Sequence, residues 1–193
     1  MTAEQIKEIA LKYFAQNGYE GTSLANIAND VGIKKQSIYT HFKSKDELFL
    51  LLCNETYENE LEFVLDFIEK KQDSHIKEFL YDFLIESKVR YEKHDSARFW
   101  LRTAFYPPSH LNSQVMQKVY EYLDKLEDYL LPIIDEAIKK GEISSAIEKE
   151  RVTAAFLGVL DGIFVEMLYG GPIRLEKRLD ASWYLFWLGL SIK

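Results

Sequence analysis

The fold of the N-terminal region is decided by residues 22–48, which read TSLANIANDVGIKKQSIYTHFKSKDEL. Apolar residues recur there at the spacing of one helix face, at Leu24, Ile27, Ala28 and Val31. Gly32 follows at once and supplies the permissive backbone that a tight turn needs. A second short helix is predicted over residues 35–42, with Ile38 and Phe42 facing inward. The order of helix, glycine turn and helix is typical of a helix-turn-helix.

The periodicity outside this stretch is also helical, and no credible alternating strand is present. One helix is predicted over residues 3–16, and Ser44 opens a long helix over residues 45–71. Further helices are predicted over residues 74–94, 97–106, 113–140, 149–168 and 175–192. The sequence therefore predicts an all-α fold of about nine helices. We expect a three-helix DNA-binding domain over residues 1–46 and a helical regulatory domain over residues 47–193.

The charge of the chain is unevenly distributed. The formal net charge is -7, which by itself argues against nucleic-acid binding. Residues 1–50 nevertheless carry six lysines and six acidic residues, and four of these lysines lie between Lys34 and Lys45 with no acid among them. A small basic patch on an acidic protein favours a local contact with DNA over wrapping.

Several classes of protein are disfavoured by residues that the sequence lacks. The single Cys53 permits no internal disulfide, and the four histidines have no neighbours at metal-ligand spacing, so we expect no metal site. Since no glycine-rich phosphate loop or catalytic motif is present, we expect neither an enzyme nor a cofactor. The polar N-terminus does not resemble a signal peptide. The apolar run from Val152 to Tyr169 is interrupted by two carboxylates and is interpreted as a buried helix, which predicts a cytoplasmic protein without membrane association.

The second short helix presents a row of polar side chains away from its apolar face. They are donor-rich and long enough to reach phosphates and base edges. These residues are Lys35, Gln36, Ser37, Tyr39, Thr40 and His41. The row predicts that this helix contacts DNA.

At these positions the chain resembles the TetR/AcrR family of bacterial transcriptional regulators. The resemblance covers roughly residues 6–50, about a quarter of the chain. Its features are the Phe14 to Tyr19 helix end, the Thr22-Ser23 start, Ile27-Ala28 with Val31-Gly32, the Ile38-Tyr39-Thr40-His41-Phe42 core and the Lys43 to Leu48 segment. Several constrained positions agree in order and spacing, which makes the pattern more specific than a lone helix-turn-helix. The rest of the chain matches only in length and helical layout.

The resemblance implies roles for individual residues. Gln36 and Ser37 are expected to read bases with help from Lys35 and Thr40, whereas phosphate contacts are expected from Thr22, Ser23, Lys34, Tyr39, His41 and Lys45. Alternatives remain for some of them. Tyr39 could be a packed core aromatic, Ser23 could serve only as a helix cap, and Lys34, like Lys43, could be merely solvated.

The last two predicted helices are apolar on nearly every side, so other protein surfaces must pack against all of their sides. The family resemblance implies a homodimer, and a two-fold interface would bury the sides of these helices that their own subunit leaves exposed. The expected interface residues are Ala155, Gly158, Val159, Gly162, Trp183, Phe186 and Trp187. The alternative is that both helices form the core of a monomer.

The resemblance also implies a small-molecule effector, and aromatic residues mixed with polar groups are the material of such a pocket. The candidate lining is Tyr91, Arg98, Phe99, Arg102, Phe105, Tyr122, Asp161 and Phe164. The carboxylates of Asp161 and Glu166, within an apolar helix, need a partner such as Arg98, Arg102 or a cationic ligand. Alternatively they lie at the dimer interface or reach solvent.

Together these features predict a repressor that a small hydrophobic or aromatic molecule releases from double-stranded operator DNA. The alternative is a helical small-molecule-binding or interaction protein without operator-specific DNA binding. The sequence does not identify the effector.

Overall fold

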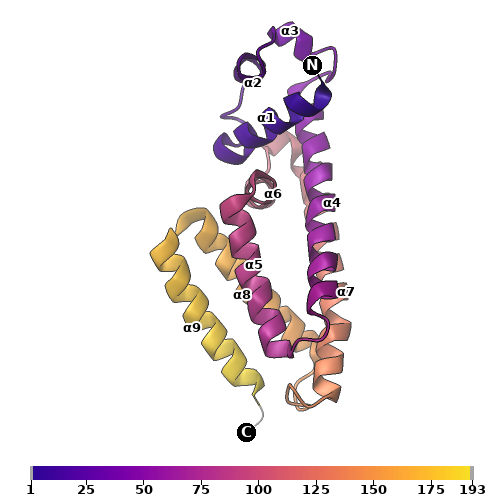
Figure 1. The fold of residues 1–193 in the computed structure, drawn as a ribbon, viewed down its shortest axis with the longest axis vertical. Coiled ribbons are helices and arrows are strands. Elements are labelled where there is room, and N and C mark those ends of the chain that lie inside the picture. The colour runs from indigo at the N-terminus through magenta and orange to yellow at the C-terminus, as the bar shows by residue number, and fades with distance from the viewer. Residues whose placement is uncertain (1, 192–193) are drawn as a thin grey trace. The chain divides into compact units, whose positions relative to one another are not determined.

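The computed structural model describes residues 2–191, and all regular structure in that range is helical (Figure 1). Its elements in chain order are α1 (Ala3–Asn17), α2 (Leu24–Val31), α3 (Lys35–Ile38), α4 (Lys45–Lys71), α5 (Ile76–Lys93), α6 (Asp95–Phe105), the 3-10 helix η1 (Ser109–Leu111), α7 (Asn112–Lys139), α8 (Lys149–Tyr169) and α9 (Pro172–Leu190). The predicted all-α fold with about nine helices is confirmed for these residues.

The chain divides into two compact units. The first contains the residues up to Glu62 together with Tyr91–Tyr122, and the second contains Phe63–Arg90 with the residues from Leu123 onward. Both α4 and α7 therefore contribute residues to each unit. This division differs from the predicted boundary at residue 46, because α6 and the first two thirds of α4 pack with the N-terminal helices. The functional boundary remains a prediction.

The first unit is centred on three phenylalanines from three helices. Phe14 of α1 and Phe49 of α4 meet edge to face with ring centroids 5.1 Å apart, and Phe49 and Phe99 of α6 lie 5.3 Å apart. Phe14 and Phe99 are both 0% exposed. This aromatic cluster fixes α1 to the first part of α4 and to α6, since edge-to-face pairs add to the free energy of burial.

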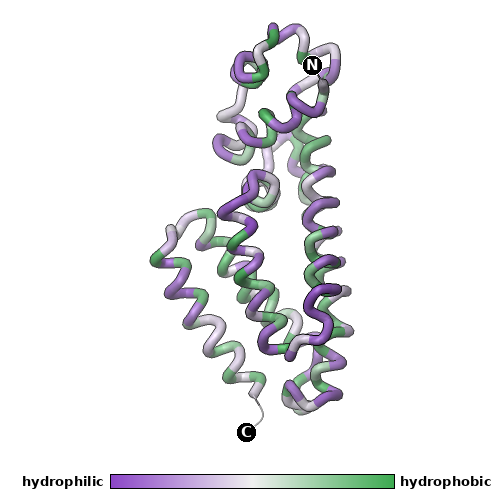
Figure 2. Tube along the Cα trace, in the orientation of Figure 1, coloured by the Kyte–Doolittle hydropathy of each residue, from purple (hydrophilic) through white to green (hydrophobic). Residues whose placement is uncertain are grey.

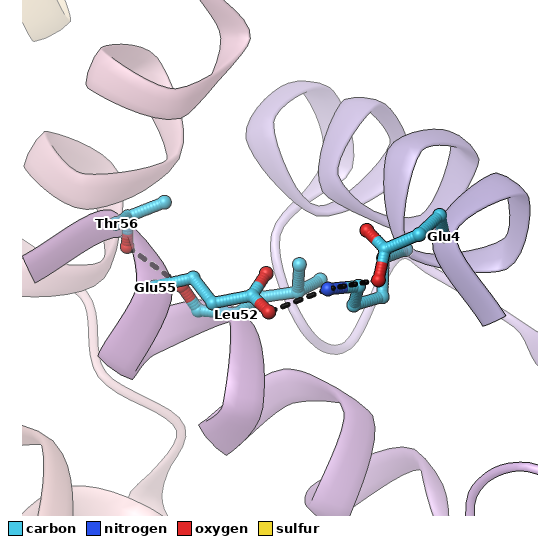
Figure 3. Close-up of polar contacts among 5 residues, drawn as sticks. Glu4, Leu52, Glu55 and Thr56 are labelled. Carbon is cyan, nitrogen blue, oxygen red and sulfur yellow. Dashed lines mark hydrogen bonds and ion pairs between the residues drawn. The ribbon is translucent and has the colours of Figure 1, made fainter. Parts of the chain in front are cut away.

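A charged contact joins the same two helices at the surface of this unit (Figure 3). The Nζ atom of Lys7 on α1 lies 2.8 Å from Glu4 and 2.5 Å from Glu55 on α4. Hydrogen bonds to these two carboxylates raise the pKa of Lys7. At the next residue of α4, the hydroxyl of Thr56 donates to the carbonyl oxygen of Leu52 at 2.8 Å, so this buried hydroxyl is satisfied within its own helix.

The second unit has an aromatic core of its own. Phe67 of α4 lies 5.2 Å from both Phe79 and Phe83 of α5, and Phe83 lies 6.2 Å from Phe156 of α8, measured between ring centroids. Apolar and polar residues alternate along the helices as the chain turns (Figure 2). This pattern is the helical periodicity that predicted the elements.

Two helices differ from their predicted bounds by three residues or more, and one short helix was not predicted. The helix predicted over residues 35–42 ends at Ile38, because the hydroxyl of Thr40 bonds to the Ser37 carbonyl at 2.7 Å and the next amides bond three residues back. The 3-10 helix η1 was not predicted. The last helix begins at Pro172 rather than Leu175, since proline fits the first helical turn. Its predicted end at Ile192 lies outside the described residues.

The buried carboxylate of Glu166 is held by α9. Its side chain is 2% exposed, and its oxygens lie 3.0 Å from Nε of Arg174 and 2.5 Å from a terminal nitrogen of Arg178. The expectation that Arg98 or Arg102 pairs with Glu166 is wrong. The two arginines lie one turn apart on α9, and periodicity within α8 alone could not reveal them.

Gly170 leaves the space that this ion pair needs. A Cβ atom added there would overlap Oε2 of Glu166, although the α-region backbone of Gly170 tolerates any residue. We expect Gly170→Ala to lower the free energy of unfolding by about 1–3 kcal/mol, the usual cost of overpacking. Guanidinium denaturation followed by circular dichroism measures this change.

Gly189→Ala is the matched control, because no atom lies within 4 Å of its added Cβ and the residue is exposed within α9. It should stabilise the chain by about 0.5–1 kcal/mol through helix propensity. Equal effects of the two variants would contradict the proposed role of Gly170.

Candidate nucleic-acid interface and regulatory region

An open hollow on the first unit gathers residues from α2, α3 and the start of α4. Its lining consists of Thr22, Ser23, Leu24, Lys35, Tyr39, Lys43, Ser44 and Lys45. Three of these residues are lysines and none is acidic. A hollow of this charge, lined by groups that donate hydrogen bonds, is suited to a phosphate backbone.

Two helix N-termini border this hollow. The hydroxyl of Ser23 accepts the Asn26 amide at 3.1 Å at the start of α2, and the hydroxyl of Ser44 accepts the Glu47 amide at 3.1 Å at the start of α4. The predicted roles of both serines as caps are confirmed. Gly32, with φ 79° and ψ 32°, adopts the left-handed conformation at the turn between α2 and α3. The remaining free amides and the helix dipoles favour an anion at these N-termini.

Most of the predicted DNA contacts are accessible. The exposed ones are Ser23, Lys34, Lys35, Gln36, Tyr39, Thr40 and His41, whereas Ser37 and Lys45 are half-buried. Tyr39 is 49% exposed, so the alternative that it is a core aromatic is wrong. Ile38 and Phe42 are buried as predicted.

Two residues around the hollow require correction. Thr22 is 2% exposed and its hydroxyl donates to the Gly18 carbonyl at 2.7 Å, so it is a packed residue rather than a free phosphate donor. Lys43 was left out of the predicted contacts, yet it is exposed and lines the hollow. Its place in the lysine-rich stretch was the available indication.

The start of α4 is anchored by a cluster of polar side chains. The Nζ atom of Lys45 lies 3.9 Å from the ring centroid of Tyr19, a cation–π contact, and burial lowers the pKa of Lys45. Asp46 accepts a hydrogen bond from the hydroxyl of Tyr19, and the same oxygen lies 3.3 Å from Nε2 of His110. This cluster fixes the α4 N-terminus between the end of α1 and η1.

The bond from Tyr19 is the main reason that the pKa of Asp46 lies below its ordinary value, with His110 and Lys45 adding to the effect. We expect Tyr19→Phe to raise the pKa of Asp46 toward that ordinary value. A carboxylate with a depressed folded pKa stabilises the fold at neutral pH, and this contribution disappears as the pH falls through the folded value. The variant should therefore lose less stability than the parent on acidification. NMR titration of the Asp46 carboxyl carbon checks the shift, and an unchanged pKa would contradict it.

The predicted effector pocket is not assembled as expected. Phe99 belongs to the aromatic core, and Tyr122 is 6% exposed against Trp100, with ring centroids 5.5 Å apart. Arg98 pairs with Asp95 of its own helix at 2.7 Å. Phe99 and Tyr122 are therefore packing residues. The sequence could not distinguish this role from a pocket, because an aromatic residue on an apolar helix face gives the same pattern in a core and in a cavity wall.

The other members of the predicted pocket belong to two different units. Burial raises the pKa of Tyr91, while Arg98 and Arg102 oppose the shift, so these three groups lie near one another. Phe105 is 38% exposed. Asp161 and Phe164 belong to the second unit, where Asp161 is on an exposed face of α8.

The second unit contains a cavity of about 240 Å³. Its lining consists of Ile68, Lys71, Gln72, Ser74, Ile76, Phe79, Pro132, Ile133, Glu136, Ala137, Lys140 and Glu142. None of these residues was predicted. They come from helix ends that lie far apart in the sequence, which only the tertiary structure brings together.

The outer sides of α8 and α9, which pack against each other, form what we call the α8–α9 face. Its exposed residues are Ala154, Ala155, Gly158, Asp161 and Gly162 on α8, and Ile173, Lys177, Ala181, Tyr184, Leu185 and Leu188 on α9. Three of the predicted interface residues, Ala155, Gly158 and Gly162, lie on this face, and Val159 is half-buried beside it.

The aromatic residues predicted for the interface are half-buried, and their place in an interface stays a prediction. Trp183 packs on Tyr81 with centroids 5.2 Å apart, Phe186 packs on Phe156 at 6.0 Å, and Trp187 packs on His75 at 6.2 Å. These three side chains contact their own unit. The exposed apolar residues of this part of α9 are Tyr184, Leu185 and Leu188, and Leu185 is 65% exposed.

Within residues 2–191, α8 is also the one helix long and apolar enough to cross a membrane. Its most apolar window of 18 residues has a mean hydropathy of 1.7 and is 39% buried. A core helix of a soluble protein has the same length and composition, so this observation alone decides nothing about a membrane.

Comparison with known proteins agrees with the geometry of the first unit. The family model described as "Bacterial regulatory proteins, tetR family" matches residues 6–52. The chain is 28% identical over 137 residues to the biofilm operon icaADBC HTH-type negative transcriptional regulator IcaR of Staphylococcus epidermidis, covering 68% of this chain and 69% of the relative. It is 26% identical over 183 residues to the HTH-type transcriptional repressor AcnR of Corynebacterium diphtheriae, covering 93% and 88%.

Solved structures share the whole fold. A TetR-family transcriptional regulator from Agrobacterium tumefaciens superposes with a TM-score of 0.75 at 18% identity, covering 98% of this chain and 97% of that one. The regulator FadR from Bacillus subtilis in complex with stearoyl-CoA gives 0.71 at 21% identity, covering 98% and 100%. AibR in complex with isovaleryl coenzyme A and operator DNA gives 0.67 at 20% identity, covering 94% and 96%.

Proposed function

Because this chain belongs to the TetR family of bacterial regulatory proteins, we propose that it is a cytoplasmic repressor that binds operator DNA as a homodimer and leaves it when a small molecule binds. One observation supports the DNA-binding part most directly. Two helix N-termini and three lysines surround one hollow without a carboxylate, beside the exposed Gln36 and Thr40.

The hollow holds the phosphate backbone in this proposal, whereas the exposed side chains of α3 read the bases. Lys35, Lys43 and Lys45 neutralise phosphates, and the amides at the α2 and α4 N-termini donate to them. Gln36 and Ser37 carry sequence preference, since an amide side chain pairs with adenine edges in the major groove.

The second copy covers the α8–α9 face and sets the spacing of the two heads. Two helix-turn-helix heads then address half-sites about one helical turn, roughly 34–36 Å, apart. Exposed leucines and a tyrosine on α9 beside small residues on α8 are apolar surface that association removes from water.

The cavity in the second unit is the candidate effector site. Its apolar floor contains Ile76, Phe79 and Ile133, and Lys71 and Lys140 lie among the charged residues of its lining. α4 supplies Lys71 to this cavity and Lys45 to the hollow, so a shift of α4 is the proposed route of release. The ligand must bind the two arrangements of α4 with different affinity.

Fluorescence anisotropy of the DNA upstream of the chain's own coding sequence tests this function. We expect saturable binding at low salt that survives an excess of scrambled competitor and weakens steeply with salt. Stearoyl-CoA and isovaleryl-CoA are the first effectors to add, because they are bound in two structural relatives. Failure to bind any such DNA at low salt would leave a helical interaction protein as the better description.

A further inference from the structure

His110 reaches the DNA-binding helices from a distant part of the sequence. It lies in η1, the connection between α6 and α7, 64 residues after Asp46. Its Nε2 atom lies 3.3 Å from Oδ1 of Asp46, and its ring meets the ring of Tyr19 edge to face with centroids 5.1 Å apart. η1 therefore contacts both the segment that follows α1 and the first turn of α4.

The first turn of α4 is the part of that helix that borders the hollow. Ser44 and Lys45 line the hollow, and the Nζ atom of Lys45 also lies 3.9 Å from the centroid of the Tyr19 ring. The imidazole of His110 and the ammonium of Lys45 therefore contact the same ring, within about one Debye length, roughly 8–10 Å, of each other. A charge on His110 acts at this range on a phosphate bound beside Lys45.

The carboxylate of Asp46 is the group near this helix N-terminus that repels a phosphate. Asp46 directly follows Lys45, and two like charges at short range repel each other. The hydrogen bond from Tyr19 is the main cause that lowers the pKa of Asp46, and His110 adds to it, so the carboxylate is ionised at neutral pH. The bonds to Oδ1 hold the carboxylate toward Tyr19 and η1, and Asp46 does not belong to the lining of the hollow.

Histidine is the side chain whose charge changes between pH 5 and 8, and its charged ring forms a stronger hydrogen bond with a carboxylate. We infer that His110 is a positioning residue for operator binding: its protonated ring holds Asp46 away from the phosphates and balances its charge, so that protonation of His110 strengthens the contact between the α4 N-terminus and DNA. This inference rests on the operator binding of the proposed function and adds to it a residue outside the helix-turn-helix.

The direction of the effect follows from the charges around the ring. Asp46, which bonds to the ring, and Glu20, which lies near Lys45, favour the protonated form. Lys45 and Arg102, whose guanidinium lies beside Gly18, disfavour it. Bound DNA adds phosphates, and a nearby anion favours the charged form of a base. The complex therefore binds the proton more tightly than the free chain, and operator binding strengthens as the pH falls from 8.5 to 6.

A double-mutant cycle on DNA affinity tests the inference. The parent, His110→Asn, Asp46→Asn and the double variant are titrated against the labelled duplex from upstream of the coding sequence, at pH 6 and pH 8.5 and constant salt. We expect the two residues to be coupled by about three- to fivefold in affinity at pH 6, as for a good exposed ion pair, and by less than about twofold at pH 8.5. The exposed His41 also changes its charge, but it is present in all four proteins and cancels in the cycle.

Two controls separate positioning from a general effect on the fold. The side chain of His110 is 48% exposed, so its replacement leaves the core intact, and guanidinium midpoints of the four proteins verify this. His94→Asn is the matched variant, because His94 is exposed in the first unit and its side chain makes no capping hydrogen bond at the start of α6. It should keep the affinity and the pH profile of the parent.

The dependence of affinity on salt distinguishes positioning from direct contact. The slope of log K against log salt should be the same for the parent and His110→Asn, because no phosphate contact is lost. A slope smaller by about one would overturn the inference, since His110 would then contact DNA itself. Absence of coupling with Asp46, or equal coupling at both pH values, would also overturn it. A parent that binds no duplex at low salt would instead remove the proposed function on which the inference rests.

Discussion

Replacing both Lys35 and Lys43 with glutamate should weaken operator binding by about a hundredfold or more at low salt. Both side chains are exposed and line the hollow between the α2 and α4 N-termini. Each substitution removes a phosphate contact and adds a charge that repels phosphate. The affinity of the variant should also depend less on salt, because the slope of log K against log salt falls by about one for each phosphate that is no longer neutralised.

The double variant Lys12→Glu and Lys93→Glu is the matched control. Both lysines are exposed in the first unit, outside the lining of the hollow, and the net charge changes by the same amount. Anisotropy titrations of the two variants at several salt concentrations separate a local contact from the overall charge. Equal reductions in affinity would place the DNA elsewhere on the chain.

Phe14→Ala should have the largest effect on stability. The ring is 0% exposed and lies 5.1 Å from Phe49 and 6.1 Å from Phe99, measured between centroids. Emptying such a site costs about 3–5 kcal/mol, a large part of the 5–15 kcal/mol that stabilises a typical domain. We expect a lower midpoint in guanidinium, and loss of DNA binding at temperatures where the first unit is unfolded.

Tyr120→Ala provides the comparison, because Tyr120 is an aromatic residue of the same unit that is 59% exposed. Its removal should change the free energy of unfolding by less than about 0.5 kcal/mol. Circular dichroism during guanidinium denaturation measures both variants. A small effect of Phe14→Ala would mean that the cluster collapses into the space that the ring occupied.

The positions of the helices could be read from the sequence to a large extent. The long helix over residues 45–71 has the predicted bounds, since Ser44 caps its start and good helix formers fill it. The helix over residues 35–42 was predicted too long because its donors bond back to nearby carbonyls. The pattern of apolar residues does not show where a side chain competes with the backbone for hydrogen bonds, so it did not predict this early end of the helix.

The two candidate sites differ in how much of each could be predicted from the sequence. The predicted DNA-contacting stretch is local, so the same short segment that shows the pattern also forms the surface, and its exposed residues follow from one helix period. Thr22 is the exception, because its burial depends on the end of α1 packing above it. The candidate effector cavity is lined by the ends of α4, α5 and α7, and no pattern within one helix identifies which ends meet.

The sequence by itself determined that this chain is helical, that its first fifty residues contain a helix-turn-helix, and where most helices begin and end. These properties depend on neighbours within a few residues along the chain. The tertiary structure alone decided that Phe99 and Tyr122 are core residues, that Glu166 pairs with Arg174 and Arg178, and that Leu185 rather than Trp187 is exposed on α9. Periodicity shows that a helix has an apolar face, but what covers that face depends on residues far away in the sequence.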